Sequence, residues 1–131
     1  MNTQTIQECM SASFANTPFP AVVQRLAGAG VRSYTADLVT LRKTYYGVAR
    51  EAHDEAMPLE KAPAVAAAFD SSGVATTVKA IQRGEIGYAE FLRRIMASGS
   101  SHYEVFFDGR KAMYFGRDGE FYTEPFPARA P

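Results

Sequence analysis

The densest group of side chains able to do chemistry is the run Glu-Ala-His-Asp-Glu at positions 51–55. A histidine among carboxylates can bind a divalent cation, or act as a base because nearby negative charge raises its pKa. On a helix, Glu51 and Glu55 would share one face. A solvated charged loop has the same composition, however. The other histidine, His102, is distant and Cys9 is the single cysteine, so we predict no metal site and no cofactor.

A second candidate site rests on tyrosines in segments that have the composition of strands. A phenol joins an apolar ring to a polar tip, so tyrosines can line a ligand groove, although in strands they more often form a core. Strand alternation sends the neighbours Tyr45 and Tyr46 to opposite faces. Carboxylates at strand ends could lie beside such a groove. The candidate ligand-binding residues are Tyr34, Asp37, Tyr46, Tyr103, Tyr114 and Glu124.

Basic pairs precede aromatic pairs at Arg42-Lys43 and Arg110-Lys111, a pattern that can bind single-stranded nucleic acid. The alternative interpretation is charge on edge strands, which discourages the addition of further strands. Fourteen basic and fourteen acidic side chains cancel, which disfavours a nucleic-acid partner. No residue is assigned a catalytic role: Cys9 has no histidine near it in sequence, and we interpret it as a buried structural thiol.

These residues must be positioned by a small fold. A chain of 131 residues with 47% hydrophobic content supports one domain over residues 1–131. No apolar run approaches the roughly 18–20 residues of a membrane span, and no leader sequence is visible, so we predict a cytoplasmic protein without a membrane partner.

Apolar spacing predicts helices over Thr3–Phe14, from Pro18 to a stop at Gly28 or Gly30, over Val74–Arg83 and over Glu85–Ser98. Residues 48–72 form a variable insert of helix and loop, with a helix predicted over Leu59–Phe69 despite Pro63.

Extended segments are predicted at Val31–Asp37 and Leu41–Gly47, and again in a C-terminal meander. Asp108-Gly109 and Asp118-Gly119 separate the strands of the meander, because Asp-Gly favours tight hairpin turns. Tight turns place Tyr103 opposite Tyr114, and Phe115 opposite Tyr122. A last strand and a proline-rich tail occupy residues 120–131, where the prolines exclude a central strand.

An internal duplication organises these elements. The residues Gly30, Tyr34, Tyr45, Tyr46 and Gly47 recur at a shift of 69 as Gly99, Tyr103, Tyr114, Phe115 and Gly116. The pseudo-repeats span about 17–47 and 86–116. The predicted fold class is therefore α+β, with duplicated helix-plus-hairpin units forming one antiparallel sheet and helices packed on one face. Neither hairpin would be stable alone, so the halves must share a core.

Several motifs together resemble the YbcV-like small bacterial domain of unknown function, whose members are sometimes labelled phage-envelope proteins. The resemblance is carried by segments 30–37, 44–47, 81–92, 114–119 and 124–127. It implies a bacterial or phage-related origin and a fold, but no reaction. Residues 48–72 do not match.

The leading hypothesis is a non-enzymatic binding or protein-interaction module, which could self-associate as a homo-oligomer through an exposed sheet face or edge. The alternative is a small-molecule-binding domain or enzyme with a cleft between the two pseudo-repeats, with Tyr34, Tyr103, Asp37 and Glu124 near its mouth.

Overall fold

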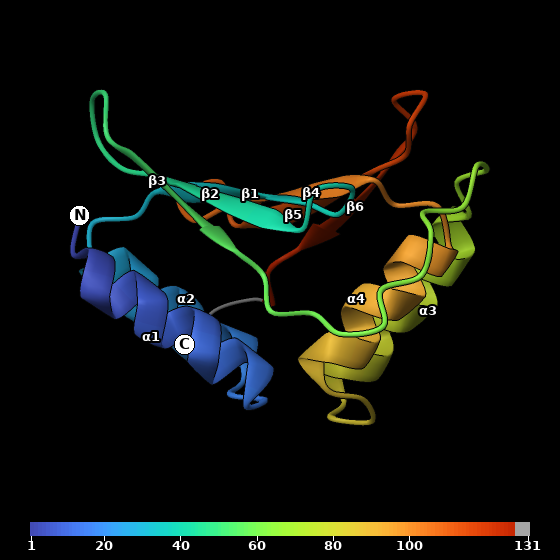
Figure 1. Cartoon of the computed structure of the whole chain (residues 1–131), viewed down its shortest axis with the longest axis horizontal. Helices are drawn as coiled ribbons and strands as arrows, with labels where there is room; N and C mark the ends of the chain where they lie inside the picture. The colour runs from blue at the N-terminus through green and yellow to red at the C-terminus, as the bar shows by residue number, and fades with distance from the viewer. Residues whose placement is uncertain (128–131) are drawn as a thin grey trace.

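The computed structural model describes residues 1–127, and within them four helices cover one face of a six-stranded antiparallel sheet (Figure 1). The other face of the sheet carries no helix from this part of the chain. The elements in order are α1 Thr3–Phe14, α2 Phe19–Gly28, β1 Ser33–Asp37, β2 Arg42–Tyr46, β3 Ala52–Ala56, α3 Ser71–Gln82, α4 Tyr88–Ala97, β4 His102–Phe106, β5 Lys111–Phe115 and β6 Phe121–Pro125. The predicted α+β class is confirmed.

The sheet has the order β3-β2-β1-β4-β5-β6, so β1 and β4 pair at its centre. In that pair Thr35 lies opposite Glu104, and Ser33 lies opposite Phe106. Thr35 and Glu104 are also 69 positions apart. Each central strand therefore pairs with its own counterpart about a local two-fold axis, and the two hairpins extend the sheet in opposite directions.

The duplication is wider than the predicted segments 17–47 and 86–116. A shift of 69 carries β1, β2, β3 and α2 onto β4, β5, β6 and α4, residue for residue, while α1 matches α3 at a shift of 68. Each half is thus helix, helix and three strands. The halves share one hydrophobic core, to which the sheet contributes side chains such as Tyr45 and Val105, and the helices Leu26 and Ile95.

The helix starts repeat as well. Asn2 caps α1 by accepting a hydrogen bond from the Thr5 amide, and Asp70 caps α3 by accepting one from the Gly73 amide. Just after α2 and α4, Gly30 and its counterpart Gly99 have φ of +94° and +90°, which a glycine adopts without strain.

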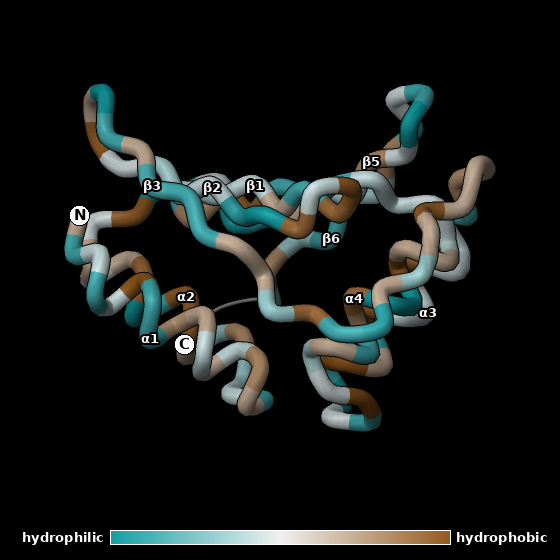
Figure 2. Tube along the Cα trace, in the orientation of Figure 1, coloured by the Kyte–Doolittle hydropathy of each residue, from teal (hydrophilic) through white to brown (hydrophobic). Residues whose placement is uncertain are grey.

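The segment 48–72 corrects two predictions. The helix predicted over Leu59–Phe69 is absent, because Pro58 and Pro63 interrupt it. Residues 52–56, read as a charged loop or helix, instead form the edge strand β3, which is hydrophilic along most of its length (Figure 2). No side chain of this edge strand is fully buried, so its sequence lacks the apolar alternation of an inner strand.

The linker from β3 to α3 is held against the rest of the fold. The Ala66 amide donates to the Met96 carbonyl, and the Asp70 amide donates to the Ser98 carbonyl. The Arg93 guanidinium donates to the Glu60 carbonyl at 3.0 Å. This segment is an ordered connection that runs beside α4.

The C-terminal meander forms as predicted, with one shift of register. Tyr103 lies opposite Tyr114, as predicted. Phe115 lies opposite Phe121 instead of Tyr122, because five residues rather than a tight two-residue turn separate β5 from β6. In the preceding hairpin Arg110, not Asp108 or Gly109, adopts the positive φ. The last four residues of the predicted segment 120–131 lie outside the described residues.

Candidate functional site

A cavity of about 590 Å³ lies between the two helix pairs and the face of the sheet that they cover. The turn from α1 to α2 (residues 16–20) borders one side, and the turn from α3 to α4 (residues 84–87) borders the other. These turns are counterparts in the duplication. The cavity is therefore a cleft between the two halves, in the place that the second hypothesis requires.

Tyrosines line its floor. Tyr34 of β1, Tyr103 of β4 and Tyr114 of β5 alternate inward along their strands and are buried. Tyr103 packs edge-on to Tyr34 and to Phe91, with ring centroids 6.2 Å apart in both pairs. These contacts fix the rings, so the phenols have defined positions.

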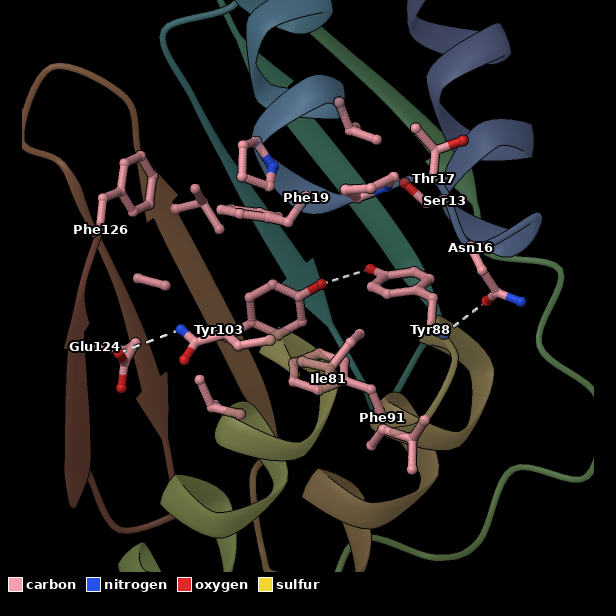
Figure 3. A pocket seen from close by; sticks show the side chains of 18 of the residues that line it. Ser13, Asn16, Thr17, Phe19, Ile81, Tyr88, Phe91, Tyr103, Glu124 and Phe126 are labelled. Atoms are coloured by element: carbon pink, nitrogen blue, oxygen red, sulfur yellow. Dashed lines mark hydrogen bonds between the residues drawn. The ribbon is translucent and has the colours of Figure 1, made fainter. Parts of the chain in front are cut away.

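A hydrogen bond connects this tyrosine cluster to helix α4. The hydroxyls of Tyr88 and Tyr103 lie 2.5 Å apart, which joins the first residue of α4 to the centre of the sheet (Figure 3). The Tyr88 amide donates to Asn16 Oδ1 at 3.0 Å, and the Tyr88 ring packs edge-on to Phe14. Tyr88 is thus held by residues of both halves.

Burial keeps these phenols neutral. It raises the pKa of Tyr34, Tyr88, Tyr103 and Tyr114 well above the ordinary value, because a phenolate would lose its hydration in this apolar surrounding. Each phenol therefore keeps its proton at neutral pH. One proton of the Tyr88–Tyr103 pair lies in the bond between them, and the phenol protons not used in this way can be donated to an oxygen of a bound molecule.

The cavity wall also contains an amine. Lys43 of β2 points to the helix-covered face, is only 3% exposed, and lines the cavity. Its Nζ lies 4.6 Å from the centre of the Tyr88 ring and 5.1 Å from that of Tyr34. Within residues 1–127, no hydrogen bond or ion pair holds this amine. Burial lowers the Lys43 pKa to about 7, and the negative charge of Glu55 opposes that shift.

A carboxylate lines the side of the cavity that β6 forms. Glu124 accepts a hydrogen bond from the Tyr122 hydroxyl at 2.7 Å. It also accepts one from Gln82 Nε2 at 3.3 Å (Figure 3). The bond to the carboxylate raises the pKa of Tyr122 to about 12. The cavity therefore carries an amine in the first half and a carboxylate in the second.

The structure brings together four of the six candidate ligand-binding residues. Tyr34, Tyr103, Tyr114 and Glu124 line the cavity. Asp37 does not: its Oδ1 accepts from the amides of Val39 and Thr40 in the turn after β1. Tyr46 does not either, since it lies on the uncovered face of the sheet and is 42% exposed.

The polar run 51–55 is dispersed. Glu51 pairs with the amino group of Met1, and Asp54 pairs with Arg42 at 2.7 Å on the uncovered face of the sheet. His53 and Glu55 remain together, with Nε2 and Oε2 3.3 Å apart. Among residues 1–127 no cluster of three or more histidine, cysteine or acidic side chains could hold a metal ion.

The edge-strand interpretation of the basic pairs is wrong, because β2 and β5 are inner strands. Arg42 is engaged by Asp54, while Lys43 turns inward beside the tyrosines. Arg110 lies over the Phe126 ring and donates to the Pro127 carbonyl. These contacts do not form a shared basic surface. Cys9 is buried on α1, as predicted, and burial raises the pKa of its thiol.

Sequence reasoning missed Lys43 and Tyr88. Strand alternation could have identified the first, since Lys43 and the buried Tyr45 share one face of β2. Tyr88 falls within the apolar spacing of α4, and nothing in that spacing shows that its hydroxyl reaches the sheet.

Comparison with known proteins gives a family but no activity. A family model described as "Protein of unknown function (DUF1398)" matches residues 7–125. The uncharacterized protein Mb2035 of Mycobacterium bovis is 30% identical over 113 residues, which cover 86% of this chain and 69% of the relative. The uncharacterized protein Rv2012 of Mycobacterium tuberculosis matches to the same extent. The chain therefore belongs to the DUF1398 family.

Proposed function

We propose that this protein binds a small, mainly apolar molecule in the cavity between its two halves. The observation that carries this proposal is the cavity itself: about 590 Å³, lined by residues of both halves, with aromatic walls and few polar groups. Pockets for small molecules share this composition, in which an apolar lining supplies affinity and a few fixed polar groups supply orientation.

The polar groups define the chemistry of the ligand. The phenols of Tyr34 and Tyr103 keep their protons and favour a ligand with an oxygen acceptor, such as a hydroxyl or carbonyl group. The aromatic rings around them favour a flat apolar body. The proposed function is binding alone and includes no chemical reaction of the ligand.

A fluorescence titration with naphthylmethanol tests the proposal. The unmodified protein should bind this alcohol saturably. The variant Ala112→Leu places a larger side chain on the cavity floor and should weaken binding by about tenfold or more. Phe121→Ser changes the uncovered face of the sheet and serves as the control. Equal binding by all three proteins, each shown to be folded by circular dichroism, would contradict a site in this cavity.

A second candidate function is interaction with a second copy of this chain through the uncovered face of the sheet. Phe121 is 59% exposed there, and the ring of Phe115 lies between those of His102 and Phe121, with centroids at 4.8 and 6.4 Å. Such exposed aromatic surface is typical of interaction sites. Sedimentation velocity should show a dimer that Phe121→Ser dissociates. A monomer at all concentrations would exclude it.

Other expectations stay predictions. The YbcV-like subgroup, a phage-related origin and a cytoplasmic location rest on the sequence resemblance and composition alone. In the described part of the chain, no helix is long and apolar enough to cross a membrane.

A further inference from the structure

Lys43 is the polar group of the cavity that the fold itself does not use. A buried ammonium is ordinarily paired with a carboxylate or held by several acceptors, since burial without partners is costly. Glu55 lies opposite Lys43 in the register of β2 and β3, but its carboxylate is paired with His53 instead. The Lys43 amine therefore has no hydrogen-bonding or ionic partner in residues 1–127, and its neighbours there include the Tyr34 and Tyr88 rings.

The second half shows that the fold does not need an amine at this position. The counterpart of Lys43 is Ala112, which lies opposite Glu124 as Lys43 lies opposite Glu55. Both residues line the cavity. A short side chain thus satisfies the same strand geometry on one side of the two-fold axis. The strand geometry therefore does not itself call for the long amine on the other side.

The surroundings of Lys43 favour a neutral, nucleophilic amine. The groups that face it are the Tyr34 and Tyr88 rings from β1 and α4, the Cys9 thiol of α1 and the Glu55 carboxylate of β3. Of these, Glu55 opposes the loss of the proton from Lys43, but burial outweighs its effect, so the pKa of Lys43 falls to about 7. Lysines desolvated in this way are the ones that attack carbonyl groups.

We propose that the Lys43 amine condenses with the carbonyl group of a small apolar aldehyde held in the cavity. The lone pair of Nζ forms a bond to the carbonyl carbon, while the carbonyl electron pair moves to the oxygen, which takes up one of the two protons of the amine. The carbon–oxygen bond of this carbinolamine then breaks, its electron pair leaves with the oxygen, the nitrogen lone pair forms the carbon–nitrogen double bond, and Nζ passes its second proton to the departing oxygen. The products are an imine and one molecule of water. This inference rests on the proposed function, because it requires the ligand to enter the cavity.

The phenols fit this reaction. Tyr88 and Tyr103 lie in the same cavity wall as Lys43 and keep their protons at neutral pH. One of their two protons lies in the hydrogen bond between them, and the other can be donated to the carbonyl oxygen. Polarisation of the carbonyl group by such donors favours attack at its carbon.

Trapping with borohydride tests the proposal. Borohydride reduces an imine to a stable secondary amine, and peptide mass spectrometry then locates the modified lysine. The chain has only four lysines, and Lys61, Lys79 and Lys111 are exposed. At pH 7 about half of the Lys43 side chains are neutral, against roughly one in a few thousand ordinary lysines. With naphthaldehyde, labelling of Lys43 should exceed that of each exposed lysine by about tenfold or more.

Two variants control the experiment. Lys43→Met should abolish the fast labelling, while Lys79→Met, which removes an exposed amine, should leave it unchanged. Labelling spread evenly over all four lysines would overturn the proposal.

Binding without reaction is a separate outcome. If naphthylmethanol or naphthoate binds in the cavity but naphthaldehyde is not trapped at Lys43, the imine proposal is wrong and the proposed binding function stands. If none of the three compounds binds, the proposed function itself fails.

Discussion

Lys43 in the first half and Ala112 in the second occupy equivalent positions in hairpins whose strands have the same bounds at a shift of 69. The edge strands differ in the side chain that hydrogen-bonds to their carboxylate. His53 and Glu55 of β3 correspond to Tyr122 and Glu124 of β6, so each edge has a carboxylate with a neighbouring hydrogen-bond partner. The backbone geometry is shared between the halves, whereas the polar groups of the cavity are not.

Comparison of the two halves separates positions where the fold requires a given residue from positions where it does not. Where both halves carry similar residues, as at Tyr34 and Tyr103 or at Gly30 and Gly99, the requirement comes from the fold. Where they differ, as at Lys43 and Ala112, the fold tolerates both, and the difference changes the polar lining of the cavity. Substitutions at matched positions can test this separation.

The largest effect is expected at the two glycines that follow α2 and α4. A Cβ on Gly99 would lie 2.1 Å from the Ala68 carbonyl oxygen, while one on Gly30 would lie 3.5 Å from its nearest neighbour, Met1. Both positions have positive φ, which costs alanine about 1–2 kcal/mol. We expect Gly30→Ala to lower the free energy of unfolding by about that amount. Gly99→Ala should lower it by about 3–5 kcal/mol, because the linker that contains Ala68 must also move. Urea denaturation measures both, and equal losses would contradict the asymmetry.

The next effect concerns the buried amine. In the unfolded chain Lys43 has a pKa of about 10.4, and in the folded chain about 7. Between these values the unfolded chain binds more protons, so the free energy of unfolding rises with pH. Lys43→Met removes this slope and should stabilise the protein at pH 7 by about 1–4 kcal/mol. The gain should shrink toward pH 10.

Lys79→Met is the matched control for that experiment, because Lys79 is exposed on α3. It should change neither the stability nor its pH dependence. A destabilised Lys43→Met variant would show that the amine supports the fold, and would remove the contrast with Ala112.

A smaller and symmetric effect is expected at the helix caps. Asn2→Ala and Asp70→Ala each remove a side chain that accepts from a free amide of the first turn. Each should lower the free energy of unfolding by about 1 kcal/mol. Thermal denaturation followed by circular dichroism measures the loss in each variant. A loss confined to one of the two would show that the halves depend on their caps unequally.

The smallest effect is expected at Tyr122. Its hydroxyl donates to Glu124 at the edge of the sheet, and Tyr122→Phe should cost less than about 1 kcal/mol. The same variant should remove the tyrosine that ionises at about pH 12 in a spectrophotometric titration. If the tyrosine that is lost instead ionises near the ordinary pKa of about 10, the hydroxyl does not act on this carboxylate.

Much of the fold could be predicted from local signals. The apolar spacing of α4 and the Asp-Gly turns of the meander identified their elements, and the shift of 69 identified the duplication. The edge strand β3 was missed because His53, Asp54 and Glu55 resemble a charged loop. The shift of 69 positions between the halves could have identified β3 as a strand, since residues 52–56 correspond to the strand at 121–125.

The candidate site was less predictable. Tyr34 and Tyr103 could be chosen as strand aromatics repeated in both halves, and they line the cavity. Tyr46 was chosen on the same grounds and lies on the opposite face. The space between the halves could not be predicted, because it depends on how far apart the helix pairs pack, and no local spacing encodes that distance.

The pairing of Thr35 with Glu104 has a consequence for the origin of this chain. Because each central strand pairs with its own counterpart, two copies of a single half could assemble into the same sheet about a true two-fold axis. A gene encoding one half would then specify a homodimer with its cavity at the subunit interface. Duplication and fusion of that gene would free each copy to change alone, and a lysine could then be acquired on one wall only.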